Sequence, residues 1–111
     1  MTTSQLLIQV SSQYDLPRLK CLPLREQPAF RVTQSASTCS NSELLAALIG
    51  GPKQIELAEA LLLHFGGEIR RLYHAHPVEL AKVKGINQAT AIRIKAAFNL
   101  GLRLNHPDEE R

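Results

Sequence analysis

The stretch Leu80-Ala-Lys-Val-Lys-Gly-Ile-Asn-Gln-Ala-Thr-Ala-Ile-Arg-Ile-Lys95 decides the fold of this chain. It predicts a short helix, a tight turn at residues 84–87 and a second helix, because Leu80, Val83 and Ile86 are spaced to pack back onto the second helix. Such a turn leaves consecutive backbone N–H groups unpaired at the positive end of a helix dipole. This arrangement suits a phosphate group, so a nucleic-acid backbone is the expected ligand.

The charge distribution points to the same stretch. The whole chain of 111 residues has a net charge of only +3, but residues 77–103 contain five cationic side chains and one acidic residue, Glu79. Concentrated positive charge is what a surface needs to bind a nucleic-acid backbone, although a solvated helix face without a partner has a similar composition. The five cationic residues are Lys82, Lys84, Arg93, Lys95 and Arg103.

Helical patterns fill the chain from residue 40 to residue 104. Ser40 and Glu43 have the spacing of a capping box, in which two side chains satisfy backbone N–H groups at a helix start. His76 is a predicted N-cap, because Pro77 suits the first position of a helix. These signals and the apolar periodicity predict five helices: one between Ser40 and Gly50, one between Pro52 and Gly66, a short one around Ile69 to Tyr73, one beginning at Pro77 and one from about Gln88 to Leu104.

Residues 1–39 differ in composition from the rest of the chain. Pro17, Pro23 and Pro28 fall within twelve residues, which excludes a long helix there. We therefore expect an irregular N-terminal arm at residues 1–39, lying extended along the helical body. A helical domain is expected at residues 40–105 and a tail at residues 106–111.

The turn resembles a known motif. Val83-Lys84-Gly85-Ile86-Asn87, followed by Ala89, Ala91 and Ile94, is similar to the helix-hairpin-helix motif, in which a second glycine usually stands where this chain has Asn87. Asn tolerates a left-handed backbone, so the turn can form, but its side chain hinders the closest approach of a phosphate. The first helix, Gly50-Gly51-Pro52-Lys53 and the second helix resemble a looser copy of this layout. The resemblance implies an all-α, five-helix bundle of the paired helix-hairpin-helix type (RuvA domain 2-like).

A wider resemblance covers residues 15–104, which are similar to the N-terminal region of the RadC family of DNA-repair proteins. Members of that family normally continue into a JAB/MPN metal-binding domain with a His-x-His and Ser-x-x-Asp pattern, which this chain lacks. His74-Ala75-His76 copies the first half of that pattern, but residues 77–86 contain neither Ser nor Asp. The resemblance is carried by Asp15-Leu16-Pro17, Arg25-Glu26, Ser42 to Ile49, Ala58 to Gly66, Glu79-Leu80, Val83 to Ile86 and Ala96 to Gly101.

The motif and the charge together assign a site. Backbone N–H groups at residues 85–88 would hold one phosphate, Lys82 and Lys84 would add charge, and Thr90 and Arg93 would reach a neighbouring phosphate. We expect non-sequence-specific binding to DNA, with duplex favoured because Phe and Tyr occupy only five positions for stacking on single strands. The primary candidates are Lys82, Lys84, Gly85, Ile86, Asn87, Gln88, Thr90 and Arg93, and the secondary candidates are Gly50, Gly51 and Lys53.

The last helix is apolar on two sides. One stripe contains Ala91, Ile94, Phe98 and Leu102, and the other contains Ala89, Ile92, Ala96 and Leu100. A helix of this kind is usually buried centrally, which is the first interpretation. In the second, Ile92 and Leu100 contact the N-terminal segment, another protein or a second copy. The alternative function is then a protein-interaction or structural domain that has kept the fold but lost DNA binding.

Several other classes of function are not expected. The chain has no apolar run of membrane-spanning length and no signal peptide, so a cytoplasmic protein without membrane contact is predicted. Cys21 and Cys39 are expected to be reduced thiols, and two histidines without further ligands make a poor metal site. Glu56 and Glu59 fit a solvated helix face better than an acid–base pair. No glycine-rich nucleotide loop occurs, so we expect no cofactor and no enzyme activity.

Overall fold

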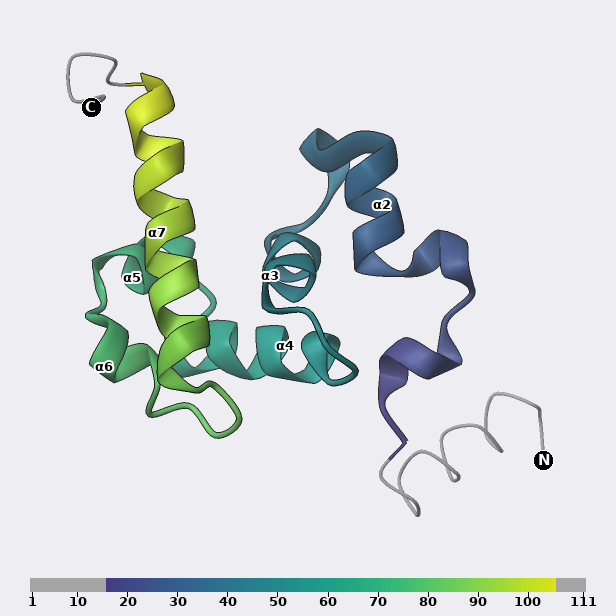
Figure 1. Ribbon diagram of the computed structural model, residues 1–111, viewed down its shortest axis with the longest axis horizontal. Helices are drawn as coiled ribbons and strands as arrows, with labels where there is room; N and C mark the ends of the chain where they lie inside the picture. The colour runs from purple at the N-terminus through teal and green to yellow at the C-terminus, as the bar shows by residue number, and fades with distance from the viewer. Residues whose placement is uncertain (1–15, 106–111) are drawn as a thin grey trace. The chain divides into compact units, whose positions relative to one another are not determined.

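The computed structural model describes residues 16–105, and the chain within this range is helical without any strand (Figure 1). The predicted all-α class is therefore confirmed, and helices occur at all five predicted places. No helix of the described part is long and apolar enough to cross a membrane. The elements are η1 (Arg18–Cys21), η2 (Leu24–Glu26), α2 (Pro28–Ser35), η3 (Ala36–Thr38), α3 (Asn41–Ile49), α4 (Gln54–His64), α5 (Ile69–His74), α6 (Pro77–Leu80) and α7 (Gln88–Asn105), where η marks a 3-10 helix.

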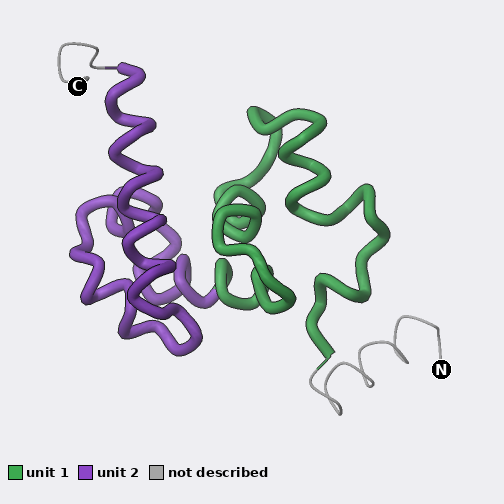
Figure 2. Tube along the Cα trace, in the orientation of Figure 1, with its two compact units in different colours: residues 1–59 green, residues 60–111 purple. Residues whose placement is uncertain are grey.

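The chain divides into two compact units, one ending at Glu59 and the other beginning at Ala60 (Figure 2). The boundary falls inside α4, whereas the sequence predicted one at residue 40. Residues 1–15 of the expected arm and the expected tail at 106–111 lie outside the described range.

Unit 1 contains a helix where the sequence predicted an irregular arm. α2 begins at Pro28, which occupies the first helical position. Proline is tolerated there because the N–H that it lacks would have no partner inside the helix. Pro28 is buried, and α2 packs against α3. The prolines therefore limit residues 17–27 to the two short 3-10 helices η1 and η2, but they do not exclude a helix that starts at Pro28.

The start of α3 follows the predicted capping box. The Ser40 hydroxyl accepts a hydrogen bond from the Glu43 N–H at 3.1 Å, and a Glu43 carboxylate oxygen accepts one from the Ser40 N–H at 3.0 Å. Glu43 also pairs with Arg31 of α2. The Ser40 N–H donor, and next the positive charge of Arg31, hold the pKa of the Glu43 carboxyl below its ordinary value. The core of unit 1 includes Leu45, Ala46, Ile49 and Ala58.

Unit 2 begins with the end of α4. The Gly67 N–H donates to the Leu62 carbonyl at 2.7 Å and the Gly66 N–H to the Leu63 carbonyl at 3.0 Å, which is the pattern of a Schellman motif. Gly66 has φ +72°, a left-handed conformation that glycine adopts without strain. The predicted cap of α6 is also confirmed, because His76 Nδ1 accepts the Val78 N–H at 3.1 Å.

α7 is the longest helix of the described chain and has two unlike faces. Thr90, Ala91 and Ile94 are buried on one face. On the same helix, the Phe98 ring meets the Tyr73 ring of α5 edge to face, with 6.0 Å between the ring centres. The end of α7 extends past α5 and α6 (Figure 1). Ile92 and Leu100 are exposed, so central burial of the helix was the wrong interpretation.

Candidate nucleic-acid interface

The α6–α7 turn, defined as residues 81–87, is built on a small apolar core. Leu80, Val83 and Ile86 are buried as predicted, and α6 packs against α7. The turn is closed by two backbone hydrogen bonds, from the Val83 N–H to the Leu80 carbonyl at 3.2 Å and from the Ile86 N–H to the Val83 carbonyl at 3.0 Å. Gly85 has φ +93°, which a residue with a side chain adopts only under strain. The turn is therefore fixed by packing from within and by one glycine.

Asn87 has a different structural role from the one expected at the second glycine position of the motif. Its side-chain oxygen accepts the Thr90 N–H at 2.8 Å, and its carbonyl accepts the Ala91 N–H at 3.0 Å. These are the two bonds of an N-cap residue, so Asn87 starts α7. The Asn-x-x-Thr spacing at a helix start could have revealed this role, since Asn is a preferred N-cap. One donor that a ligand could have used is thus already satisfied.

Several neighbouring donors remain without a partner. Within residues 16–105, no acceptor lies in hydrogen-bond range of the backbone N–H groups of Lys84, Gly85, Asn87, Gln88 and Ala89. All five residues are exposed. Two of these N–H groups, at residues 88 and 89, belong to the first turn of a helix of 18 residues, and that of the N-cap Asn87 directly precedes it. The helix dipole adds positive potential there.

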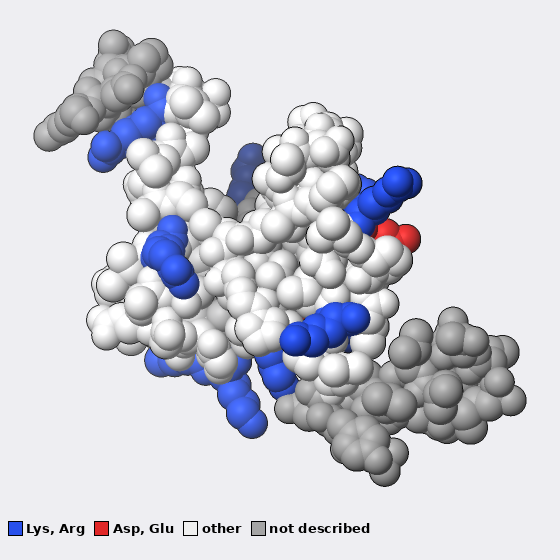
Figure 3. Space-filling view, turned by 45° about the vertical axis from the view of Figure 1, so that its right-hand side comes forward, with Lys and Arg blue, Asp and Glu red and all other residues white. Residues whose placement is uncertain are grey.

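Cationic side chains surround these donors in the sequence. Lys82, Lys84 and Arg93 are exposed, and none of them forms an ion pair with any described residue. The described part of unit 2, residues 60–105, contains seven Lys and Arg but only two acids, Glu68 and Glu79. Glu68 is already paired with Arg71 at 3.0 Å. In the view of Figure 3, Lys and Arg side chains project into solvent, while acidic side chains of the described residues show at one place.

Two of the eight primary candidates do not present their side chains to a ligand. Ile86 is 3% exposed and Thr90 is 7% exposed. The Thr90 hydroxyl instead accepts a hydrogen bond from Arg93 Nη2 at 3.1 Å, so it orients the guanidinium. The remaining six, Lys82, Lys84, Gly85, Asn87, Gln88 and Arg93, are exposed.

The secondary candidates belong to unit 1. Gly50 and Gly51 have φ +70° and +78°, and they form the turn between α3 and α4 with Lys53 at its end. The buried Gln54 side chain donates to the Gly51 carbonyl at 2.8 Å, which stiffens this turn. Gly50, Gly51 and Lys53 therefore lie in unit 1, whereas the primary candidates lie in unit 2.

Sequence reasoning also overlooked two cations of unit 2. Arg70 is exposed and has no ion pair with a described residue, so it adds to the positive field; the Arg-Arg pair at 70–71 was a visible signal. Lys95 was counted only as surface charge. Its ammonium group instead donates to the Tyr73 carbonyl and lies 5.2 Å from the centre of the Tyr73 ring, so it holds α5 against α7.

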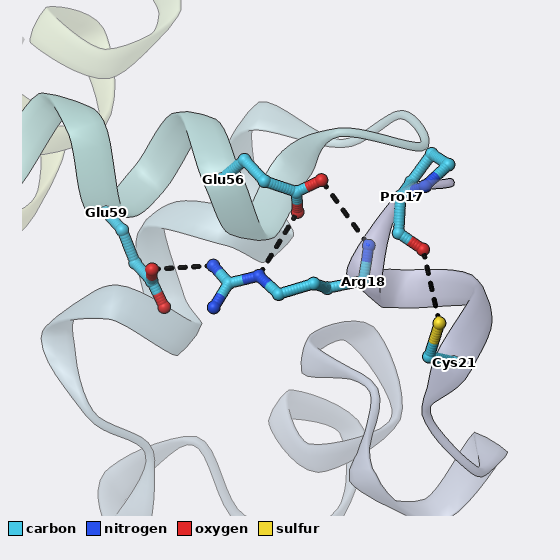
Figure 4. A network of polar contacts seen from close by, with 5 residues as sticks. All are labelled: Pro17, Arg18, Cys21, Glu56 and Glu59. Atoms are coloured by element: carbon cyan, nitrogen blue, oxygen red, sulfur yellow. Dashed lines mark hydrogen bonds and ion pairs between the residues drawn. The ribbon is translucent and has the colours of Figure 1, made fainter. Parts of the chain in front are cut away.

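Other polar clusters of the described chain have structural partners. The Arg18 guanidinium lies 2.6 Å from a Glu59 carboxylate oxygen and 3.8 Å from one of Glu56. The Arg18 backbone N–H also donates to the Glu56 carboxylate (Figure 4). This network connects η1 to α4. Glu56 and Glu59 are therefore both ion-pair partners of Arg18. Cys21 and Cys39 are free thiols. Among residues 16–105, no three His, Cys, Asp or Glu side chains come together as a metal ion would need.

Comparison with known proteins identifies the family. Residues 19–92 match the family described as UPF0758 N-terminal. A UPF0758 protein of Protochlamydia amoebophila is 38% identical over 90 residues, which is 77% of this chain and 38% of the relative. UPF0758 protein YsxA of Bacillus subtilis is 39% identical over 98 residues, 83% of this chain and 42% of the relative.

The match is confined to part of each relative. A UPF0758 protein of Staphylococcus haemolyticus is 38% identical over 92 residues, which is 78% of this chain but only 40% of the relative. No solved structure matches the chain significantly. The chain spans about two fifths of the length of these curated relatives. It belongs to the UPF0758 family, the RadC family that its sequence resembles, and corresponds to the N-terminal region of that family.

Proposed function

We propose that this domain binds DNA without sequence specificity, using the α6–α7 turn as a helix-hairpin-helix that holds backbone phosphates. The observation that carries the proposal is the row of unpartnered N–H groups at residues 87–89, at the start of an 18-residue helix. Lys82 and Lys84 stand beside it without acidic partners among the described residues. Backbone donors, a helix dipole and lysines together form an anion site, and DNA is the polyanion that such a site suits.

Exposed residues of the turn and of the start of α7 have distinct parts in this proposal. The N–H groups of Gln88 and Ala89 hold one phosphate, while Lys82 and Lys84 supply long-range attraction. Arg93, oriented by Thr90, reaches the next phosphate along the strand. Contacts of this kind set the position of a protein on DNA but carry no sequence information. Residues 81–87 contain no aromatic side chain on which an unpaired base could stack, which favours duplex DNA.

The expected affinity is low and depends strongly on salt. Two to four neutralised phosphates give a slope of log K against log salt of about −2 to −4. Raising the salt from about 50 mM to about 200 mM should therefore weaken binding by roughly 10- to 150-fold. A micromolar or weaker dissociation constant is expected for a single domain. A role in DNA repair would follow from such binding, as the RadC resemblance implies.

The decisive experiment measures fluorescence anisotropy of a labelled duplex with the intact chain and with Lys84→Glu. We expect Lys84→Glu to abolish binding at low salt while the helical circular-dichroism spectrum is unchanged. The matched control is Arg25→Glu, which makes the same change in net charge at an exposed position of unit 1. Unchanged affinity in Lys84→Glu, or equal losses in both variants, would show that the turn is not the binding site.

A second candidate function rests on different observations. The Asn87 cap occupies one donor of α7, and Ile92 and Leu100 are exposed on the outer face of that helix. A domain that has kept the fold, lost DNA binding and acts through protein contacts would show both features. Such a domain would show no salt-sensitive DNA binding at any concentration. Neither candidate function includes catalysis.

A further inference from the structure

The outer face of α7 carries a ridge of apolar side chains that no described residue of unit 2 covers. Ile92 is 52% exposed, Leu100 is 66% exposed and Leu104 is 84% exposed. Ala96 completes the series and is exposed as well. The four residues, here called the outer ridge, recur at every fourth position and therefore follow one line along the helix. The opposite face, with Thr90, Ala91 and Ile94, already supplies the packing of α7 within its unit.

The spacing and the side-chain sizes of the outer ridge suit packing against another helix. Ridges of residues four apart are the surfaces that interlock in the commonest helix–helix packing class. Ala96 is small and stands between Ile92 and Leu100, so a side chain of a crossing helix can fit over it. The ridge lacks Trp, Tyr and Phe, and the first two are the residues enriched at the membrane–water interface. Its shape therefore favours a helical partner over a membrane surface.

The charges beside the outer ridge indicate the chemistry of that helix. α7 contains Arg93, Lys95 and Arg103 but no Asp or Glu. Lys95 is committed to the Tyr73 carbonyl, which leaves the two arginines beside the ridge. A second copy of α7 would bring two more arginines and no carboxylate within that helix, whose only nearby acids in the sequence are Asp108, Glu109 and Glu110 after its end. Pairing of two α7 helices therefore lacks charge complementarity along the helices themselves. A helix with Asp or Glu beside its own apolar stripe satisfies both guanidinium groups.

We infer that the outer ridge of α7 is a docking site for an acidic amphipathic helix of a protein partner. The contact is small, since one helix crossing buries less than the roughly 1,200 Å² of a standard interface, so the complex is weak and exchanges rapidly. The four ridge residues take no part in the α6–α7 turn, so the apolar contact does not depend on DNA binding, whereas Arg93 is shared between the two proposals.

The test uses two synthetic helical peptides of about 18 residues, the length needed to cover five turns. Both carry the same Leu and Ala stripe, but one is flanked by Glu and the other by Lys. Titration into the isotopically labelled chain is followed by NMR up to millimolar peptide. We expect the Glu peptide to shift the amide signals of Ile92, Ala96 and Leu100 and to bind about tenfold more tightly than the Lys peptide at low salt.

Three variants decide between the outcomes. The double variant Ile92→Ser/Leu100→Ser should weaken the Glu peptide about tenfold or more, because it removes two apolar anchors. The control Leu63→Ser changes an 80% exposed leucine of α4 and should have no effect. Arg103→Glu should reduce the preference for the Glu peptide by at least about threefold. All altered side chains are exposed, so circular dichroism should confirm that each variant is folded.

Five results would overturn the inference. They are no binding of the Glu peptide at millimolar concentration, equal binding of both peptides, and shifts confined to residues 81–87. The fourth is binding of the chain to phosphatidylcholine–phosphatidylglycerol vesicles that the double serine variant removes, which would make the ridge a membrane surface. Sedimentation that reports a dimer lost in the double variant would assign the ridge to a second copy. Since the double variant should keep its salt-dependent DNA affinity, failure here is separable from failure of the proposed DNA site.

Discussion

Replacing Asn87 by aspartate should separate the fold of the α6–α7 turn from its proposed ligand. Asn and Asp have nearly the same shape and are equally good N-caps, so the carboxylate can accept the Thr90 N–H that Asn87 accepts at 2.8 Å. A negative charge at a helix N-terminus is also favourable, by about 0.3–1 kcal/mol. We therefore expect Asn87→Asp to leave the free energy of unfolding unchanged or to raise it by up to about 1 kcal/mol.

The same charge should strongly oppose DNA. A phosphate held by the N–H groups of Gln88 and Ala89 would lie next to the new carboxylate. At a separation of about 5 Å, two unit charges repel by about 0.8 kcal/mol in water and about 3 kcal/mol at an effective dielectric constant of 20. The expected loss of DNA affinity is therefore between about fourfold and about 150-fold.

Two measurements on the same samples test this reasoning. Urea unfolding followed by circular dichroism gives the stability, and duplex anisotropy at low salt gives the affinity. Asn87→Gly is the matched comparison, because it costs only a few tenths of a kcal/mol as an N-cap and frees the Thr90 N–H for a ligand. Its DNA affinity should equal or exceed that of the unaltered chain. Full DNA affinity in Asn87→Asp would refute the assignment of the phosphate to the start of α7.

Two further predictions concern stability. Leu80→Ala should lower the free energy of unfolding, measured by urea titration, by about 2–5 kcal/mol, because Leu80 is fully buried beneath α7. The control Leu63→Ala, at an 80% exposed position, should change it by less than about 0.5 kcal/mol. Glu43→Gln keeps the capping-box geometry but removes the charge. Because the folded-state pKa of Glu43 lies below its ordinary value near 4.5, the stability that the ionised carboxylate contributes is present above that pH and lost as the pH falls through the folded pKa. The melting temperature of the unaltered chain should therefore fall further between pH 6 and pH 3 than that of Glu43→Gln, and parallel curves would contradict the Ser40–Glu43 interaction as its cause.

Helix boundaries were predictable wherever a local chemical signal marked them. The Ser40 capping box, the His76 cap with Pro77 and the glycines after α4 involve residues within a few positions of one another. Their hydrogen bonds depend on the local backbone alone, so short-range pattern was sufficient to find them. α2 was missed because prolines were read as a general barrier, although Pro28 marks where a helix can begin.

The composition of the candidate site was only partly predictable. The sequence marked Lys82, Lys84 and the turn, but it treated Thr90 as a ligand contact. Whether a polar side chain at a helix start faces solvent depends on what packs against that turn. Here the burial of Thr90 directs its hydroxyl to Arg93. The use of Lys95 to hold the Tyr73 carbonyl depends equally on the approach of α5 to α7, which joins residues 22 positions apart.

The sequence by itself determined the all-helical class, the five helices from residue 40 onward and the tight turn at Gly85, because caps, glycines and apolar periodicity act over a few residues. Only the tertiary structure decided which of the two apolar stripes of α7 is buried. Both stripes have similar hydrophobicity, and the choice follows from which side α5 and α6 cover. That choice leaves Ile92 and Leu100 in solvent and the first N–H groups of α7 open beside two lysines.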